Sequence, residues 1–243
     1  MDRVVLDETV HVGKEILIEG PPLEALRFQE VRVGSLVTLT DARGDDFRGR
    51  VVTLSPEGAS VLIYEPFPSP TESFLEIILL QALPEKERME WIIQKATELG
   101  VSSVLPFKSE RSISLQERES KQKKAHRWQH IAFKAVEQSR RARVPRVEGY
   151  RSFREALDYC EGEGLKLLLW EREGKGLKDT LRRSHPRKIY AMVGPEGGFT
   201  EEEVHSAKGR GFVPVKLDQR ILRTETAAIT LLGILQYELG DLG

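Results

Sequence analysis

The sequence predicts an α/β protein in which helices cover both faces of a mostly parallel sheet and a small β-barrel precedes that sheet. Two observations lead to this prediction. Up to about residue 70, short apolar segments alternate with turn residues, whereas strand-like and helix-like segments alternate along the rest of the chain. Between the two parts, residues 65–70 hold three prolines, which break regular structure. We therefore place the domain boundary at residue 71 and expect domains of 1–71 and 72–243.

In the amino-terminal domain, turn residues separate five short segments of strand type. The turns fall at Gly34, 41–44 and 56–58. One polar stretch, 22–31, has apolar residues at helical spacing and predicts a short helix. The five predicted strands are 3–6, 15–18, 36–40, 49–54 and 60–64.

In the carboxyl-terminal domain, the first predicted strand, 75–81, is an uninterrupted apolar run of the kind that is buried on both faces. Pro84 suits the first turn of the next helix, which Gly100 ends. Ser152 and Thr200 each precede a glutamate three residues later, which is the capping-box pattern that starts a helix. The other predicted strands are 103–107, 165–170, 188–193 and 212–217, and further helices cover 177–183 and 224–239.

The charge of the chain is uneven although its total is only −1. Residues 1–72 hold 7 Lys and Arg against 13 Asp and Glu, while residues 73–243 hold 30 against 25. No apolar run approaches the roughly 20 residues of a membrane-spanning helix. The start of the chain lacks the pattern of a signal peptide, and the single Cys160 cannot form an intrachain disulfide. These features predict a cytoplasmic protein.

Residues 116–146 carry ten Lys and Arg against three acidic side chains, a charge of +7. Trp128, Ile131 and Val136 lie at helical spacing and predict a helix that buries one face. A solvated helix is the simpler interpretation, but charges of one sign at this density repel each other unless a polyanion meets them, which favours RNA. His126 and His130 share this segment, but nothing supplies a third ligand, so no metal site is expected.

Two loops follow predicted strands at the carboxyl edge of the sheet, where open α/β sheets bind ligands. Gly194, Gly197 and Gly198 in the first loop indicate a backbone that takes positive φ repeatedly or must let another group lie against it. This loop lacks the GK[ST] ending of a phosphate-binding P-loop, so we expect a ligand held by backbone amides and carbonyls. In the second loop, Thr224 is the predicted N-cap of the last helix, and Arg223 directly precedes it, beside the free amides of the first turn. Together the loops predict one pocket between two strand ends.

The segments Gly194-Pro-Glu-Gly-Gly-Phe199 and Ile221-Leu-Arg-Thr-Glu-Thr-Ala227 resemble the signature of RsmE-type 16S ribosomal RNA methyltransferases of the SPOUT superfamily. The likeness extends to 95–101, 109–112, 135–139 and 240–243, and it is looser in the amino-terminal domain. It implies a SPOUT-type sheet with a trefoil knot, preceded by a PUA-like β-barrel that binds RNA. It also implies a homodimer that uses S-adenosyl-L-methionine to methylate N3 of one uridine near the 3′ end of small-subunit RNA.

The resemblance also implies roles for single residues. Arg223 is the first choice for a cation that stabilises negative charge on uracil once N3 has lost its proton. The general base would be Glu225 or Glu196, or none is used, and each glutamate also has a purely structural interpretation. The residues expected to hold the methyl donor are Trp170, Glu171, Gly194, Pro195, Glu196, Gly197, Gly198, Leu217, Ile221, Leu222, Thr226 and Ala227.

The acidic balance of residues 1–72 leaves two ways to bind RNA: a local arginine patch, or contacts supplied mainly by the carboxyl-terminal domain. Arg140 and Arg141 are hypothesised to reach the RNA from the other subunit. Two other functions remain open: methylation of transfer RNA or of another ribosomal position, and a non-catalytic role in ribosome assembly. The predicted RNA-binding residues are Arg3, Arg32, Lys121, Lys124, Arg127, Arg140 and Arg141.

Overall fold

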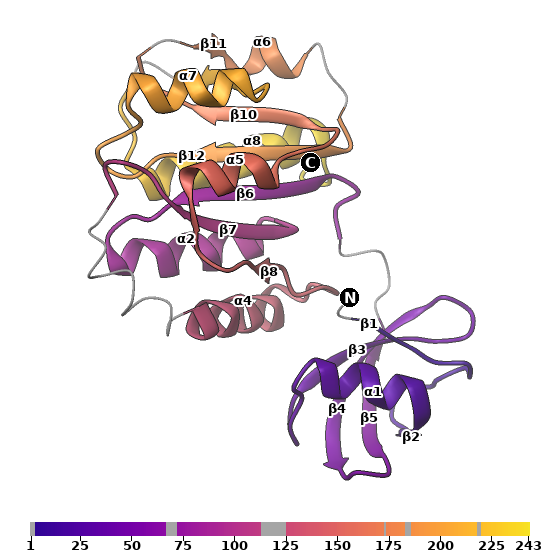
Figure 1. Ribbon diagram of the computed structural model, residues 1–243. Helices are drawn as coiled ribbons and strands as arrows, with labels where there is room; N and C mark the ends of the chain where they lie inside the picture. Colours follow the sequence, from indigo (N-terminus) through magenta and orange to yellow (C-terminus); the bar gives the residue numbers. More distant parts are fainter. Residues whose placement is uncertain (1–2, 67–71, 113–124, 173, 183–185, 218–219) are drawn as a thin grey trace. The chain divides into compact units, whose positions relative to one another are not determined.

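The computed structural model describes residues 3–66, 72–112, 125–172, 174–182, 186–217 and 220–243. The chain divides into two compact units (Figure 1). The first comprises Met1–Glu72 together with Arg140–Val144, and the second comprises Ser73–Ser139 and Pro145–Gly243. The segment Arg140–Val144 lies inside the predicted carboxyl-terminal domain, so the first unit is not one continuous stretch of sequence.

The first unit is a curled five-stranded sheet around its own apolar core, which includes Leu26, Leu39 and Ile63. The strand order is β1-β3-β4-β5-β2; β1 runs parallel to β3 and the other pairs are antiparallel. Helix α1 ends before the predicted residue 31 because Glu30 takes a left-handed φ of +53°. The elements are β1 (Arg3–Val5), β2 (Glu15–Ile18), α1 (Gly20–Phe28), β3 (Leu36–Thr40), β4 (Asp46–Leu54) and β5 (Ala59–Pro66).

Buried polar contacts fix the segment Arg140–Val144 to the first unit. Arg141 is only 5% exposed, and its guanidinium donates to the Glu72 carboxylate at 2.6 Å. The carbonyl of Arg141 accepts a hydrogen bond from Arg48 at 2.9 Å, and the next carbonyl accepts one from Thr38 at 2.8 Å. This segment is therefore held by side chains of the first unit, although its neighbours in sequence belong to the second.

The second unit contains one sheet with the order β11-β13-β10-β12-β6-β7-β8, in which all these pairs are parallel, and β9 also pairs with β7. No helix among the described residues has the length and apolarity that a membrane crossing needs. The elements are β6 (Glu76–Ala82), α2 (Lys86–Glu98), β7 (Ser103–Lys108), α4 (Ala125–Ser139), β8 (Arg146–Val147), β9 (Arg151–Ser152), α5 (Phe153–Tyr159), β10 (Leu165–Leu169), β11 (Lys175–Gly176), α6 (Leu177–Leu181), β12 (Lys188–Val193), α7 (Glu201–Gly209), β13 (Val213–Lys216) and α8 (Thr224–Leu239).

Helices cover both faces of this sheet. Helices α2, α4 and α8 pack together on one face, and α5 and α7 lie on the other (Figure 1). Residues of α5 and α7 share a buried cluster with Phe107 and Phe199, whose rings stack 6.4 Å apart. Burial raises the pKa of Cys160 in the same cluster to about 12, so this thiol stays protonated and packs as an apolar side chain. The predicted class, an α/β sheet layered with helices and preceded by a small β-unit, is confirmed.

The spatial order of the strands brings distant parts of the sequence together. Strand β12 lies between β10 and β6, and β13 lies on the other side of β10. Because the strands are parallel, the carboxyl ends of β6, β10, β12 and β13 meet at one edge of the sheet. The chain must then pass along this edge to travel from the end of β13 to the start of α8.

The buried pair of Arg141 and Glu72 predicts a large stability effect. Arg141→Met should lower the free energy of unfolding by about 3 kcal/mol, because Glu72 keeps its charge in a half-buried site without its partner. Calorimetric unfolding of the full chain measures this change. Arg140→Met is the matched control, since Arg140 has a side chain that is 77% exposed and lies 3.8 Å from Glu65. Equal losses for the two variants would contradict the structural role of Arg141.

Candidate active site

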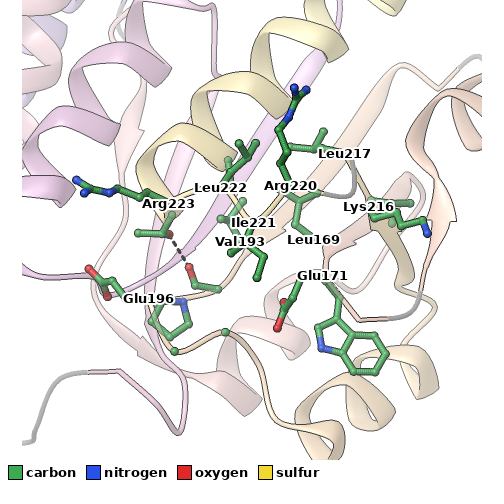
Figure 2. A pocket seen from close by; sticks show the side chains of 18 of the residues that line it. Leu169, Glu171, Val193, Glu196, Lys216, Leu217, Arg220, Ile221, Leu222 and Arg223 are labelled. Atoms are coloured by element: carbon green, nitrogen blue, oxygen red, sulfur yellow. Dashed lines mark hydrogen bonds between the residues drawn. The ribbon is translucent and has the colours of Figure 1, made fainter.

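A cavity opens at the carboxyl edge of the sheet in the second unit. Its volume is about 490 Å³, which is in the range of pockets that hold small-molecule ligands. The loop after β12 and the loop between β13 and α8 form most of its wall (Figure 2). Arg88 from α2, residues 169–171 at the end of β10, and Val215 and Lys216 of β13 also line it. Both loops that the sequence singled out therefore face the same space.

The three glycines of the first loop have different reasons to be glycine. Only Gly198 takes a left-handed φ, +67°, and a Cβ there would also lie 3.2 Å from the Glu171 carboxylate. A Cβ on Gly194 would lie 3.2 Å from the Phe199 ring, and one on Gly197 would lie 3.1 Å from Arg111. Of the two alternatives, the close approach of another group applies to all three glycines and a positive φ to Gly198, and the groups that approach are side chains of the protein itself.

Arg111 and Phe199 hold this loop from the side of the protein. The Arg111 guanidinium donates to the carbonyl of Gly197 at 2.8 Å. Phe199 is 2% exposed and packs in the buried cluster with Phe107. Glu203 accepts a hydrogen bond from the Thr200 amide at 3.0 Å, which completes the predicted capping box at the start of α7. The backbone of the loop is therefore fixed by its own neighbours.

A buried hydroxyl joins the two loops. The Thr224 hydroxyl donates to the Gly194 carbonyl at 2.6 Å (dashed line in Figure 2). The same hydroxyl accepts from the Gln81 side-chain amide at 3.1 Å. All three residues are buried. Thr224 was predicted as the N-cap of the last helix, but Arg223 occupies that position. The prediction failed because the hydroxyl bonds a neighbouring strand end rather than the free amides of its own helix.

Charged side chains of both signs line the cavity. Glu196 and Arg223 lie on one side, and Glu171 and Lys216 lie on the other (Figure 2). Glu196 accepts hydrogen bonds from Arg88 at 2.8 Å and from the Glu85 amide at 3.0 Å. Four cationic side chains against two anionic ones line the described part of the wall, which favours a ligand or substrate with negative charge.

One buried donor beside the cavity lacks a partner among the described residues. Trp170 is 6% exposed, and its indole Nε1 makes no hydrogen bond within that part of the chain. Lys208 lies over the ring, 5.8 Å from its centroid. An unpaired buried N–H is costly, so an acceptor on a ligand at this wall would supply a hydrogen bond that none of the described residues makes.

Most of the predicted site residues line the cavity, but some lie outside it. The predicted donor-binding residues all line the cavity except Thr226, which is exposed on the first turn of α8. Of the predicted catalytic residues, Arg223 and Glu196 line it, whereas Glu225 does not and lies 3.8 Å from Arg88. Most of the lining residues that the sequence analysis missed lie at the end of a predicted strand or next to a predicted site residue, and this position could have identified them. Arg88 lies on α2, far from both loops in the sequence, and no sequence feature pointed to it. The missed lining residues are Arg88, Leu169, Val193, Val215, Lys216, Arg220 and Thr224.

The predicted RNA-binding arginines differ in exposure. Arg32, Arg127 and Arg140 are exposed. Arg141 is buried against Glu72, so its guanidinium is engaged inside the first unit and is not presented to RNA. No group of three potential metal ligands occurs among the described residues. The residues outside the described part, either entirely or in their side chains, are Lys121, Lys124 and Arg3.

Comparison with known proteins gives the family. The RNA methyltransferase domain model matches residues 71–236. Ribosomal RNA small subunit methyltransferase E from Bacillus subtilis is 31% identical over 211 residues, covering 84% of this chain and 82% of the relative. The enzyme of the same name from Mesomycoplasma hyopneumoniae is 31% identical over 182 residues, covering 75% and 78%.

The solved structures extend this similarity to the whole chain. A crystal structure of ribosomal RNA small subunit methyltransferase E from Neisseria gonorrhoeae, bound to S-adenosyl methionine, is 36% identical and covers 100% of both chains with a TM-score of 0.73. The fold class expected from the resemblance, a SPOUT-type sheet preceded by a PUA-like β-barrel, is therefore confirmed. The chain belongs to the ribosomal RNA small subunit methyltransferase E family.

Proposed function

We propose that the protein uses S-adenosylmethionine to methylate N3 of one uridine in the 16S RNA of the small ribosomal subunit. The observation that carries this proposal is the cavity in which the two loops of the family signature face each other. Its support from relatives is direct: one is described as bound to S-adenosyl methionine, and those named above are small-subunit RNA methyltransferases.

The residues present fit this donor. The backbone of the loop between Gly194 and Gly198 lines the cavity, and Leu217 and Leu222 offer apolar surface for an adenine ring. The unpaired indole N–H of Trp170 offers a hydrogen bond to an oxygen of the ribose or of the methionine part. When bound, S-adenosylmethionine supplies a methyl group that its sulfonium already activates. The protein has to place N3 in line with that methyl group.

Arg223 supplies the charge that the reaction needs. Removal of the N3 proton leaves negative charge shared between N3 and the two carbonyl oxygens of uracil. A cation already in place stabilises that charge without reorganisation. Arg223 lines the cavity from the N-cap of α8, where the Thr224 hydrogen bond fixes the backbone. We propose Arg223 as this cation.

Glu196 is the carboxylate that we propose as general base. It lines the cavity, whereas Glu225 does not, and Oε2 of Glu225 is buried. A base must come within hydrogen-bond reach of the proton that it takes, and this criterion favours Glu196. Glu225 then has a structural role at the first turn of α8.

Mapping of methylated bases tests the proposed function as a whole. Mass spectrometry of small-subunit RNA from cells that lack the protein should show the loss of one methyluridine, and the purified protein should restore it. Calorimetry should show that the protein binds S-adenosylmethionine. Loss of a modification in transfer RNA, or at another ribosomal position, would instead support a different RNA substrate. Absence of donor binding would support a non-catalytic assembly factor.

Arg223→Ala should separate catalysis from donor binding. We expect a fall in kcat of about 10²-fold, since the variant removes one electrostatic contact to the transition state. Methylation of purified small subunits measures the rate, and calorimetry with S-adenosylmethionine should show an unchanged affinity. Arg154→Ala on α5, exposed and outside the cavity, is the control. A fully active Arg223→Ala variant would remove Arg223 from the mechanism.

Thr224→Val should weaken donor binding. The variant keeps the shape of the side chain but leaves the Gly194 carbonyl without its short hydrogen bond, and we expect about tenfold lower affinity for S-adenosylmethionine. Thr226→Val changes the same residue type on the same turn of α8, at an exposed position that does not line the cavity. Equal calorimetric affinities for the two variants would contradict the role of the buried hydroxyl.

The basic segment should govern the salt dependence of RNA binding. Reversal of charge at Lys121, Lys123, Lys124 and Arg127 should weaken binding and reduce the slope of log K against log salt by about 0.7 for each lost contact to single-stranded RNA. Filter binding across a salt series measures the slope. Arg154→Glu provides the control for a charge change elsewhere. An unchanged slope would indicate that these side chains are solvated and do not contact RNA.

We also propose that the protein is a cytoplasmic homodimer. Trp91 on α2 and Tyr237 on α8 are 62% and 70% exposed, and these two helices are neighbours. Burying such side chains against a second copy removes apolar surface from water, which supports association. Light scattering of the purified protein determines the oligomeric state.

A further inference from the structure

Arg88 contacts carboxylates from two different elements of the site. It lies in the amino-terminal half of α2, and its Nη1 donates to Oε1 of Glu196 at 2.8 Å. Its Nε lies 3.8 Å from Oε2 of Glu225. Glu196 belongs to the glycine loop, and Glu225 belongs to the first turn of α8. One guanidinium therefore contacts a carboxylate of the glycine loop and a carboxylate of the first turn of α8.

The surroundings make this cation necessary. The side chains of Arg88, Glu196 and Glu225 are 29%, 33% and 15% exposed, so water screens their charges only in part. Oε2 of Glu225 is buried and has no hydrogen bond among the described residues, which leaves Arg88 as the cation recorded beside it. Without Arg88, two anionic side chains would remain at the same place with little compensation.

We propose that Arg88 is a positioning residue that neutralises Glu196 and Glu225 together and thereby holds the glycine loop and the first turn of α8 in the arrangement that binds the donor. This inference rests on the proposed function, because it concerns the same cavity. Glu196 directly precedes Gly197, and Glu225 directly follows Thr224. A displacement of either carboxylate therefore moves backbone that lines the cavity.

The interaction with Glu196 also limits the freedom of the proposed base. The Glu85 amide donates to the same oxygen, Oε1, at 3.0 Å, so two donors orient this carboxylate from one side. Arg88 itself lines the cavity, but its recorded partners are protein carboxylates. We therefore assign it to positioning rather than to catalysis.

The test is a charge-rescue experiment with donor affinity as the readout. Arg88→Met should bind S-adenosylmethionine about tenfold more weakly than the unmodified protein, the effect of losing one charged hydrogen bond. Adding Glu196→Gln to that variant removes one of the two opposing charges and should restore the affinity to within about threefold. A merely structural loss of the Arg88 side chain would not be rescued by a second substitution. Calorimetry gives each dissociation constant.

Arg210→Met is the matched control. Arg210 also pairs with two carboxylates, Asp158 at 2.7 Å and Glu161 at 3.0 Å, but it does not line the cavity. Its loss should leave the donor affinity unchanged. If Arg88→Met proves unstable in thermal unfolding, Arg88→Lys replaces it, since one ammonium group does not reproduce the fork that meets both carboxylates.

Two results would overturn the inference. Unchanged affinity in the Arg88 variant would show that the ion pairs do not hold the cavity. Weak binding that Glu196→Gln fails to restore would show that Arg88 acts by another route, such as direct contact with the donor. Both results are distinct from a failure of the proposed function, in which the unmodified protein itself would neither bind S-adenosylmethionine nor methylate small-subunit RNA.

Discussion

The site depends on the hydrogen bond from the Thr224 hydroxyl to the Gly194 carbonyl, together with the bond that the same hydroxyl accepts from Gln81. These residues come from the start of α8, the end of β12 and the end of β6. The contact is buried, where a polar group without a partner is expensive, so this bond stabilises the arrangement in which the two loops meet. The cavity is the space that remains above this junction.

Around that junction, the protein shapes the glycine loop from its own side. Phe199 is inserted in the core, Arg111 holds the carbonyl of Gly197, and Arg88 holds the carboxylate of Glu196. A protein side chain lies close to each of the three glycines, and all three also line the cavity. A loop fixed in this way can line a binding site without having to order itself when a ligand binds.

Burial reduces the number of basic side chains in the segment 116–146 that are available to bind RNA. The segment 116–146 has a formal charge of +7, but part of this segment, Arg140–Val144, belongs to the first unit. Arg141 there neutralises Glu72, while Arg127 on α4 and Arg140 stay exposed. A sum of charges along the sequence therefore overstates the number of cations that can meet a phosphate, since a buried pair contributes nothing to the outer field.

The sequence by itself determined the alternation of elements, the two loops and the family, because these follow from local patterns: apolar periodicity, capping boxes and the residues around Gly194 and Thr224. Of the residues that it suggested for donor binding, all but Thr226 line the cavity. Only the tertiary structure decided that Thr224 bonds a strand end instead of capping its helix, that Arg88 joins Glu196 to Glu225, and that Arg141 is buried. Each of these is a contact between elements distant in the chain. Which residues face each other depends on side-chain direction and, for the contacts of Thr224 and Arg88, on the strand order β10-β12-β6, and a local pattern carries neither.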